Sequence, residues 1–145
     1  MSANTMTQTD RRNGLLRRAM RADALISGFF GVTGLTGWVT EFSGIPASFE
    51  YGLQVFFIVY GAIVLGLSWL PAVRSAGMAV VVANLLYAVG AVGGVLTGAL
   101  PFTAAGAKFT LATAAYTLAF ATLQYLGWRR STEPITAEQM SGGFS

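Results

Sequence analysis

The chain has no cysteine and no histidine. Their absence excludes disulfide bonds, thiol redox chemistry, histidine proton relays, and metal or haem sites that need Cys or His ligands. The sequence also has no Ser-His-Asp set, no phosphate-binding loop and no pair of carboxylates within its apolar segments. We therefore expect neither enzymatic activity nor a bound metal or cofactor.

Charged residues are scarce as well. They make up 10% of the 145 residues, whereas 54% of the residues are hydrophobic. A soluble domain carries about 25% charged residues, so this composition predicts an integral membrane protein. The length is that of one domain.

Four apolar segments are long enough to cross the roughly 30 Å hydrocarbon core of a bilayer as helices. We expect spans at 22–40, 51–70, 76–100 and 109–128, which would form an all-α, four-helix transmembrane bundle within 14–130. The polar segments 1–13 and 131–145 are expected to be disordered tails. A signal peptide is the alternative for the first segment, although its uncharged stretch is longer than the usual hydrophobic region of such a peptide.

Basic residues gather on one side of these predicted spans. By the positive-inside rule, this asymmetry predicts a multi-pass protein of the plasma membrane with both termini in the cytoplasm. The loop 41–50 carries only acidic charge, and Lys108 is the one basic residue expected on the outer side. The basic residues before the first span are expected to bind anionic lipids rather than nucleic acid: Arg11, Arg12, Arg17, Arg18 and Arg21.

Each predicted span places small or polar residues on one helical face and aliphatic residues on the other. The inward polar residues are candidates for an intramembrane polar cluster: Asp23, Ser27, Ser68, Asn84, Thr117 and Gln124. Asn84 is the strongest candidate, because an unpaired amide near the middle of a bilayer costs several kcal/mol. Two interpretations stay open for it, an interhelical hydrogen bond and a contact with a ligand or ion. Asp23 is expected to reach interfacial water or to pair with an arginine.

Glycines recur on the small faces of the first and third predicted spans. They favour close helix approach, either within the monomer or between copies in a homo-oligomer. The candidate packing positions are Gly31, Gly34, Gly90, Gly94 and Gly98.

Segments 17–24, 44–47, 83–87 and 123–130 resemble those of uncharacterised small bacterial integral membrane proteins with four spans. The architecture is also similar to that of the DoxX-like four-helix proteins. The resemblance implies a bacterial plasma membrane and carries no activity.

The sequence therefore indicates a non-enzymatic membrane protein that acts through helix contacts, as an accessory, scaffold or homo-oligomeric subunit. Its expected partners are the lipid bilayer and a second copy or another membrane protein. The alternative function is a small transporter or channel with a polar path through the bundle.

Overall fold

The computed structural model describes residues 2–132, with side chains from Asn13 onward, and this part of the chain is entirely helical apart from its connections. The elements are α1 (Ser2–Gly34), α2 (Trp38–Ser43), α3 (Ala47–Leu67), α4 (Val73–Thr97) and α5 (Ala104–Thr132). The expectation of an all-α fold is confirmed.

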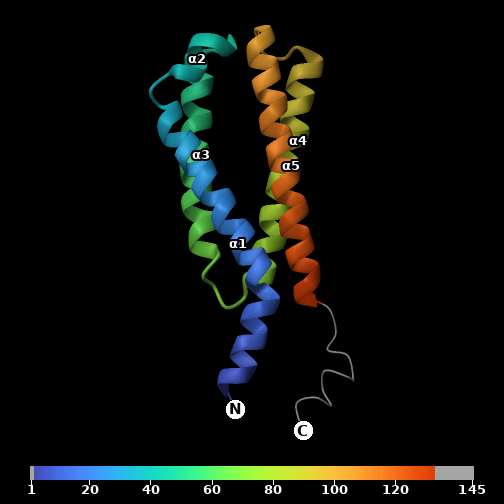
Figure 1. Ribbon diagram of the computed structural model, residues 1–145. Coiled ribbons are helices and arrows are strands. Elements are labelled where there is room, and N and C mark those ends of the chain that lie inside the picture. Colours follow the sequence, from blue (N-terminus) through green and yellow to red (C-terminus); the bar gives the residue numbers. More distant parts are fainter. Residues whose placement is uncertain (1, 133–145) are drawn as a thin grey trace.

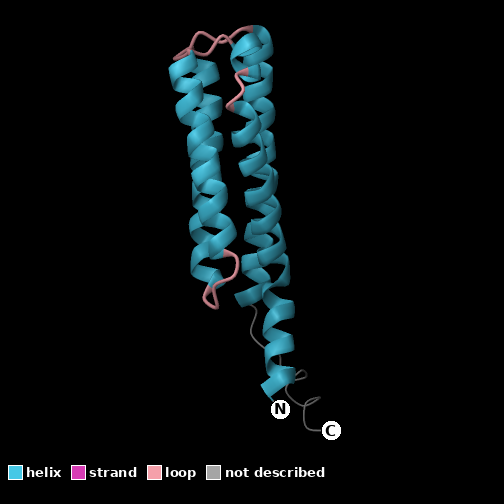
Figure 2. Cartoon of the chain, turned by 90° about the vertical axis from the view of Figure 1, so that its left-hand side faces the viewer, coloured by secondary structure: helices cyan, strands magenta, loops and turns pink. Residues whose placement is uncertain are grey.

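The four long helices form two antiparallel pairs (Figure 1). Helix α1 packs along α3, helix α4 packs along α5, and α1 also packs against α5, whereas α3 and α4 scarcely touch. In Figure 1 the two pairs lie close together at the end that holds the α3–α4 connection and diverge toward the end capped by α2. Figure 2 shows that the loops lie toward the two ends of the bundle. We call these the basic end and the α2 end.

Two of the helices in the described part of the chain, α3 and α4, are long and apolar enough to cross a membrane. This statement rests on length and composition. That all four long helices span a bilayer stays a prediction.

The predicted bounds need correction at the amino-terminal segment. Residues 2–13, expected to be disordered, belong to α1, and no proline or glycine precedes Gly14 to interrupt this helix. The predicted span 22–40 is also not continuous, because α1 ends at Gly34. Helix α2 then begins after Gly37, whose φ of 86° is left-handed and suits glycine. Of the predicted tail 131–145, residues 131 and 132 belong to α5 and the others lie outside the described residues.

The other helices begin three to five residues earlier than the apolar runs predicted, because turn and capping residues determine where they start. Helix α3 follows Pro46 directly. Helix α5 follows Thr103, whose hydroxyl accepts a hydrogen bond from the Gly106 N–H at 3.0 Å, as an N-cap residue does.

An apolar core fills the basic end of the bundle. It comprises Leu16, Met20, Ala24, Val64, Val73 and Val80. The helices approach closely here: a Cβ added to Gly61 would lie 2.7 Å from the Ala24 carbonyl oxygen, and one on Gly127 would lie 2.6 Å from the Leu16 nitrogen. The helices at the basic end are therefore closely packed around an apolar core.

Candidate functional site

Asp23 lies at the point where all four long helices meet, and its side chain is fully buried. Its Oδ2 accepts hydrogen bonds from the Tyr60 hydroxyl at 2.8 Å, from Asn84 Nδ2 at 2.9 Å and from Gln124 Nε2 at 2.9 Å. Its Oδ1 accepts hydrogen bonds from the hydroxyls of Ser27 and Tyr116, each at 3.2 Å. We call these six residues the Asp23 cluster.

The donors of the cluster also bond to one another. Asn84 Nδ2 donates to Gln124 Oε1 at 2.9 Å, and Asn84 Oδ1 accepts from the Tyr60 hydroxyl at 3.2 Å. Within the described part of the chain, no buried side-chain nitrogen or oxygen lacks a hydrogen-bond partner. The cluster is therefore a closed network in which neutral donors from α1, α3, α4 and α5 surround one carboxylate.

The structure thus brings together four of the six predicted polar residues, namely Asp23, Ser27, Asn84 and Gln124. Ser68 lies apart from them and accepts a hydrogen bond from Arg21 Nε at 3.2 Å. Thr117 is buried, and its hydroxyl donates to the Ala114 carbonyl oxygen in its own helix at 2.9 Å.

The expectation that Asp23 reaches water or an arginine is wrong. The side chains of Arg17 and Arg21 lie at the carboxyl-terminal end of α3 instead, where the last carbonyl groups of the helix attract positive charge. Arg17 donates to the Ser68 and Leu70 carbonyl oxygens at 2.6 Å and 3.0 Å, and the guanidinium of Arg21 lies 4.9 Å from the Trp69 ring centroid.

A cavity of about 500 Å³ lies between the two helix pairs, on the α2 side of the Asp23 cluster. Two members of the cluster, Ser27 and Tyr116, contribute to its lining together with Thr117. Helix α2 and the loop before α5 contribute Trp38 and Phe102. Its volume is within the range of small-molecule sites.

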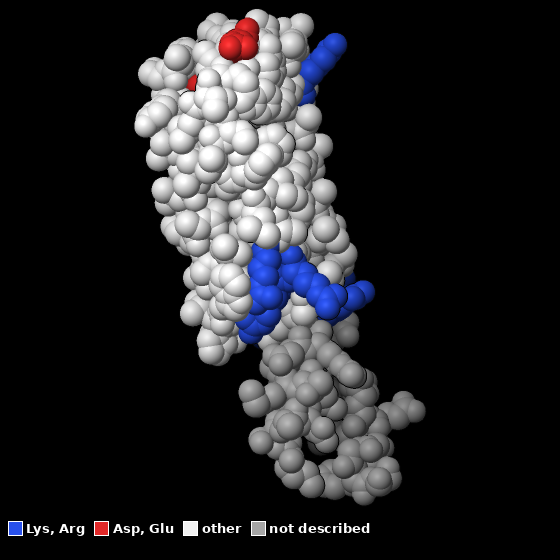
Figure 3. Space-filling view, turned by 60° about the vertical axis from the view of Figure 1, so that its left-hand side comes forward, with Lys and Arg blue, Asp and Glu red and all other residues white. Residues whose placement is uncertain are grey.

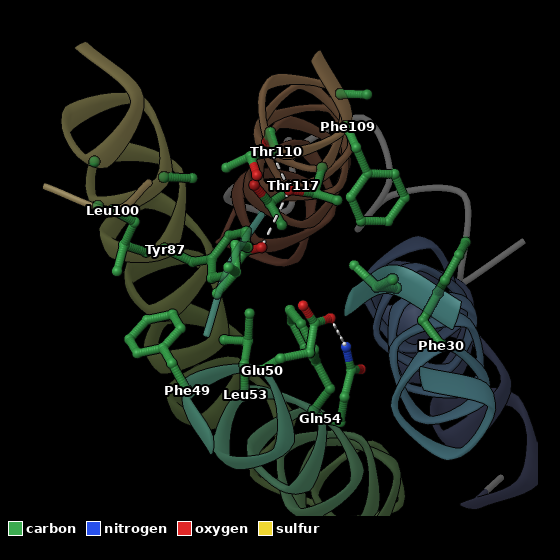
Figure 4. A pocket seen from close by; sticks show the side chains of 18 of the residues that line it. Phe30, Phe49, Glu50, Leu53, Gln54, Tyr87, Leu100, Phe109, Thr110 and Thr117 are labelled. Carbon is green, nitrogen blue, oxygen red and sulfur yellow. Dashed lines mark hydrogen bonds between the residues drawn. The ribbon is translucent and has the colours of Figure 1, made fainter. Parts of the chain in front are cut away.

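Glu50 faces this cavity from the first turn of α3, opposite Tyr87 and Thr117 (Figure 4). The residue is 2% exposed. Its Oε1 accepts a hydrogen bond from Gln54 Nε2 at 2.9 Å, and its Oε2 accepts a longer one from the Ser43 hydroxyl at 3.3 Å. The cavity therefore has a buried carboxylate in its wall.

The predicted glycine positions fall into two groups. Gly31 and Gly34 lie against α3, where an added Cβ would meet Gln54 and, at Gly31, also Ile58. At the other three, Gly90, Gly94 and Gly98, an added Cβ would meet nothing within 4 Å, so the structure shows no close helix approach within the monomer at these positions. Gly90 and Gly94 instead line the cavity, and Gly98 follows α4 with a φ of 67°.

Four site residues were not among the predicted ones: Tyr60 and Tyr116 in the Asp23 cluster, and Glu50 and Gln54 in the cavity. Helical spacing offered a signal for two of them, because Gln54 lies four residues after Glu50, which places their side chains together. Glu50 itself was assigned to a loop.

Both carboxylates are held by uncharged hydrogen-bond donors, and in the described part of the chain no group of three or more His, Cys, Asp or Glu residues is placed to hold a metal ion. No protein-family model, curated protein or solved structure matches the chain, so the geometry of the site carries the functional argument alone.

Proposed function

We propose that this protein is a four-span integral membrane protein, with both termini in the cytoplasm, that binds a small apolar molecule in the cavity between its two helix pairs. The observation that carries the proposal is the cavity of about 500 Å³ with its apolar and aromatic lining.

The distribution of side chains supports a membrane location. Large hydrophobic residues face outward on each long helix, among them Phe29 (65% exposed), Ile63 (56%), Val89 (71%) and Leu118 (44%). Polar side chains in the middle of the long helices, including Asp23 and Gln124, are fully buried. This arrangement is the reverse of that in a soluble bundle and is the one that lipid requires.

The position of the charges supports the same location. On the face drawn in Figure 3, most basic residues gather near the basic end, acidic residues and one further basic residue lie at the α2 end, and the surface between the two ends is uncharged. Helix α3 has 21 residues, which corresponds to roughly 30 Å and matches a bilayer core.

Topology is testable because the natural chain has no cysteine to react in the background. We expect a membrane-impermeant maleimide added to intact cells to label Lys108→Cys and not Arg130→Cys. Both variants should react after the membrane is permeabilised. Labelling of Arg130→Cys in intact cells would contradict the proposed orientation.

Binding is better supported than conduction. The Asp23 cluster and the apolar core close the bundle between the cavity and the basic end. The polar path that a channel needs would have to pass Asn84 and Gln124, which are buried and bonded to each other. The cavity is therefore a pocket that ends at the cluster.

Photolabelling with benzophenone, a neutral aromatic compound that reacts with nearby C–H bonds, tests the cavity directly. We expect labelled peptides from α3 and α4 in the purified protein. Ala91→Trp fills the cavity, since Ala91 lines it, and should lower this labelling several-fold. The matched change Ala62→Trp lies on the exposed side of α3 and should leave labelling unchanged.

The milder variant Ala91→Leu should give an intermediate decrease and guards against misfolding of the tryptophan variant. If labelling is insensitive to both Ala91 substitutions, the cavity is not the binding site.

A homo-oligomeric subunit is the second candidate function, favoured by the open glycine face of α4. Gly93 has nothing within 4 Å of an added Cβ and does not line the cavity, so a neighbouring helix could lie against it. If native mass spectrometry finds an oligomer that Gly93→Leu dissociates and Ala91→Trp does not, helix contact is the function of this face. A monomer in all variants would exclude this candidate.

A further inference from the structure

We propose that the molecule bound in the cavity is a lipophilic organic cation and that Glu50 is its counter-charge. The inference rests on the proposed function and specifies the class of its ligand.

The cavity carries a formal negative charge. Glu50 is the one formally charged residue that the described part of the chain contributes to the cavity lining. It is 2% exposed, and the side chains that bond to it, Gln54 and Ser43, are neutral. A buried carboxylate is stable when paired with a cation or fully hydrogen-bonded. The cavity of about 500 Å³ beside it is large enough for that cation.

Glu50 accepts fewer hydrogen bonds than Asp23 does. Asp23 accepts hydrogen bonds from five side chains, whereas Glu50 accepts one at 2.9 Å and one at 3.3 Å. An ionised carboxylate has about four acceptor sites. Asp23 is therefore saturated, while Glu50 retains acceptor capacity on the side that faces the cavity (Figure 4).

Aromatic side chains line much of the cavity. Aromatic faces attract cations, and they do so most strongly where water is excluded. The cavity is lined by Phe30, Trp38, Phe49, Phe57, Tyr87, Phe102, Phe109 and Tyr116. A metal ion would find too few oxygen ligands beside one carboxylate, because hard cations take six or more. An organic cation with apolar substituents fits both the charge and the lining.

The position of the cavity determines how a ligand enters it. The cavity lies where α3 and α4 diverge, and these two helices scarcely touch. In the proposed membrane this gap faces lipid, so a ligand that partitions into the bilayer can enter from the side. Lipophilicity is therefore expected of the cation.

The test compares two ions of nearly the same shape and opposite charge, tetraphenylphosphonium and tetraphenylborate. Binding is measured by equilibrium dialysis against the purified protein in lipid nanodiscs, with empty nanodiscs as the blank. We expect saturable binding of tetraphenylphosphonium only. Glu50→Gln keeps the shape of the side chain and should weaken this binding by roughly tenfold or more, as loss of a desolvated charge pair does.

Glu41→Gln is the matched control, because Glu41 is exposed at the same end of the molecule and should not affect binding. Glu50→Asp retains the charge and should recover part of the affinity, which separates a charge effect from misfolding. Equal binding of both ions by the wild-type protein, or undiminished cation binding by Glu50→Gln, would overturn the inference.

The outcomes separate the two proposals. If benzophenone labels the cavity but tetraphenylphosphonium does not bind, the cation inference fails and the proposed function stands. If neither probe binds, both fail. A neutral lipid in the cavity would give the first of these results.

Discussion

The carboxylate of Asp23 shows how one residue can join four helices. Removing a charged group from water costs many kcal/mol unless hydrogen bonds replace the lost hydration. Five neutral side chains provide these bonds. Since hydrogen bonds to a charged group contribute about 1.5–3 kcal/mol each, the Asp23 cluster is a major source of stability.

Substitution of Asp23 tests this energetic role. Asp23→Leu removes the acceptor shared by five donors; each donor left without another acceptor costs about 1–3 kcal/mol, so this change should abolish stable folding. Asp23→Asn keeps one oxygen for the donors Tyr60, Asn84 and Gln124, and its new amide group faces two hydroxyls that can turn and accept. We expect its melting temperature to fall far less than that of Asp23→Leu, as measured by circular dichroism in detergent. Equal melting of the two variants would contradict this account.

For single residues, the sequence predicts which polar side chains belong to the Asp23 cluster better than it predicts which residues they bond to. Asn84, Gln124 and Ser27 stand out because a polar group in an apolar segment needs a hydrogen bond. The position of Asp23 could not be predicted, since it lies only two residues past Arg21 in the sequence, and the direction in which its side chain leaves α1 is a property of the folded helix. Tyr60 and Tyr116 were missed because aromatic residues are common in apolar helices for other reasons.

Individual helices are matched to one another by the positions of their glycines. In α3, Gly61 lies against the backbone of α1, and an added Cβ would be 2.7 Å from the Ala24 carbonyl oxygen and 3.1 Å from the Gly28 nitrogen. Gly52 belongs to the same helix and has nothing within 4 Å. One helix therefore contains a glycine that packing requires and one that packing does not.

This pair gives a prediction with an internal control. Gly61→Ala forces α1 and α3 apart and should lower the melting temperature, because overpacking typically costs about 1–3 kcal/mol. Gly52→Ala should leave stability unchanged or raise it by up to about 1 kcal/mol, since alanine favours helix more than glycine does. Thermal unfolding followed by circular dichroism distinguishes them, and a loss of similar size in both would show that propensity rather than packing governs these positions.

Helical spacing alone could not distinguish glycines that contact another helix from glycines that line the cavity. Gly31 and Gly34 contact α3, whereas Gly90 and Gly94 lie beside the cavity, although both sets follow regular helical spacing. The difference arises because α1 and α3 pack closely while α3 and α4 diverge, and divergence of two helices is a tertiary property that a local pattern does not contain. The same divergence creates the cavity, which the sequence analysis did not predict.

As a whole, the molecule consists of two helix pairs, which the apolar core and the α1–α5 contact join at the basic end. The Asp23 cluster joins them in the middle of the bundle. At the α2 end, Thr103 joins them through its N–H, which donates to the Ser43 carbonyl oxygen at 2.9 Å, and through its hydroxyl, which donates to the Phe42 carbonyl oxygen. The cavity lies between these two junctions.

Loss of the Thr103 hydroxyl should loosen the α2 end. Thr103→Val removes the bond to Phe42 and the cap on Gly106, which together contribute about 1–3 kcal/mol. We expect faster hydrogen–deuterium exchange in α2 and in the first turn of α5. Thr103→Ser keeps the hydroxyl and should behave as wild type, as should Thr97→Val, whose hydroxyl bonds within its own helix. Unchanged exchange in Thr103→Val would show that this junction is not needed.

The arrangement of the Asp23 cluster also has a consequence for biogenesis. Asp23 and Ser27 belong to α1, which leaves the ribosome before α4 and α5, the helices that contain Asn84, Tyr116 and Gln124. In the proposed membrane the carboxylate therefore enters lipid before three of its five donors have been synthesised. A chain truncated after α3 would expose an unsatisfied acid to lipid, so the cell's quality control could distinguish an incomplete protein from a finished one at a single side chain.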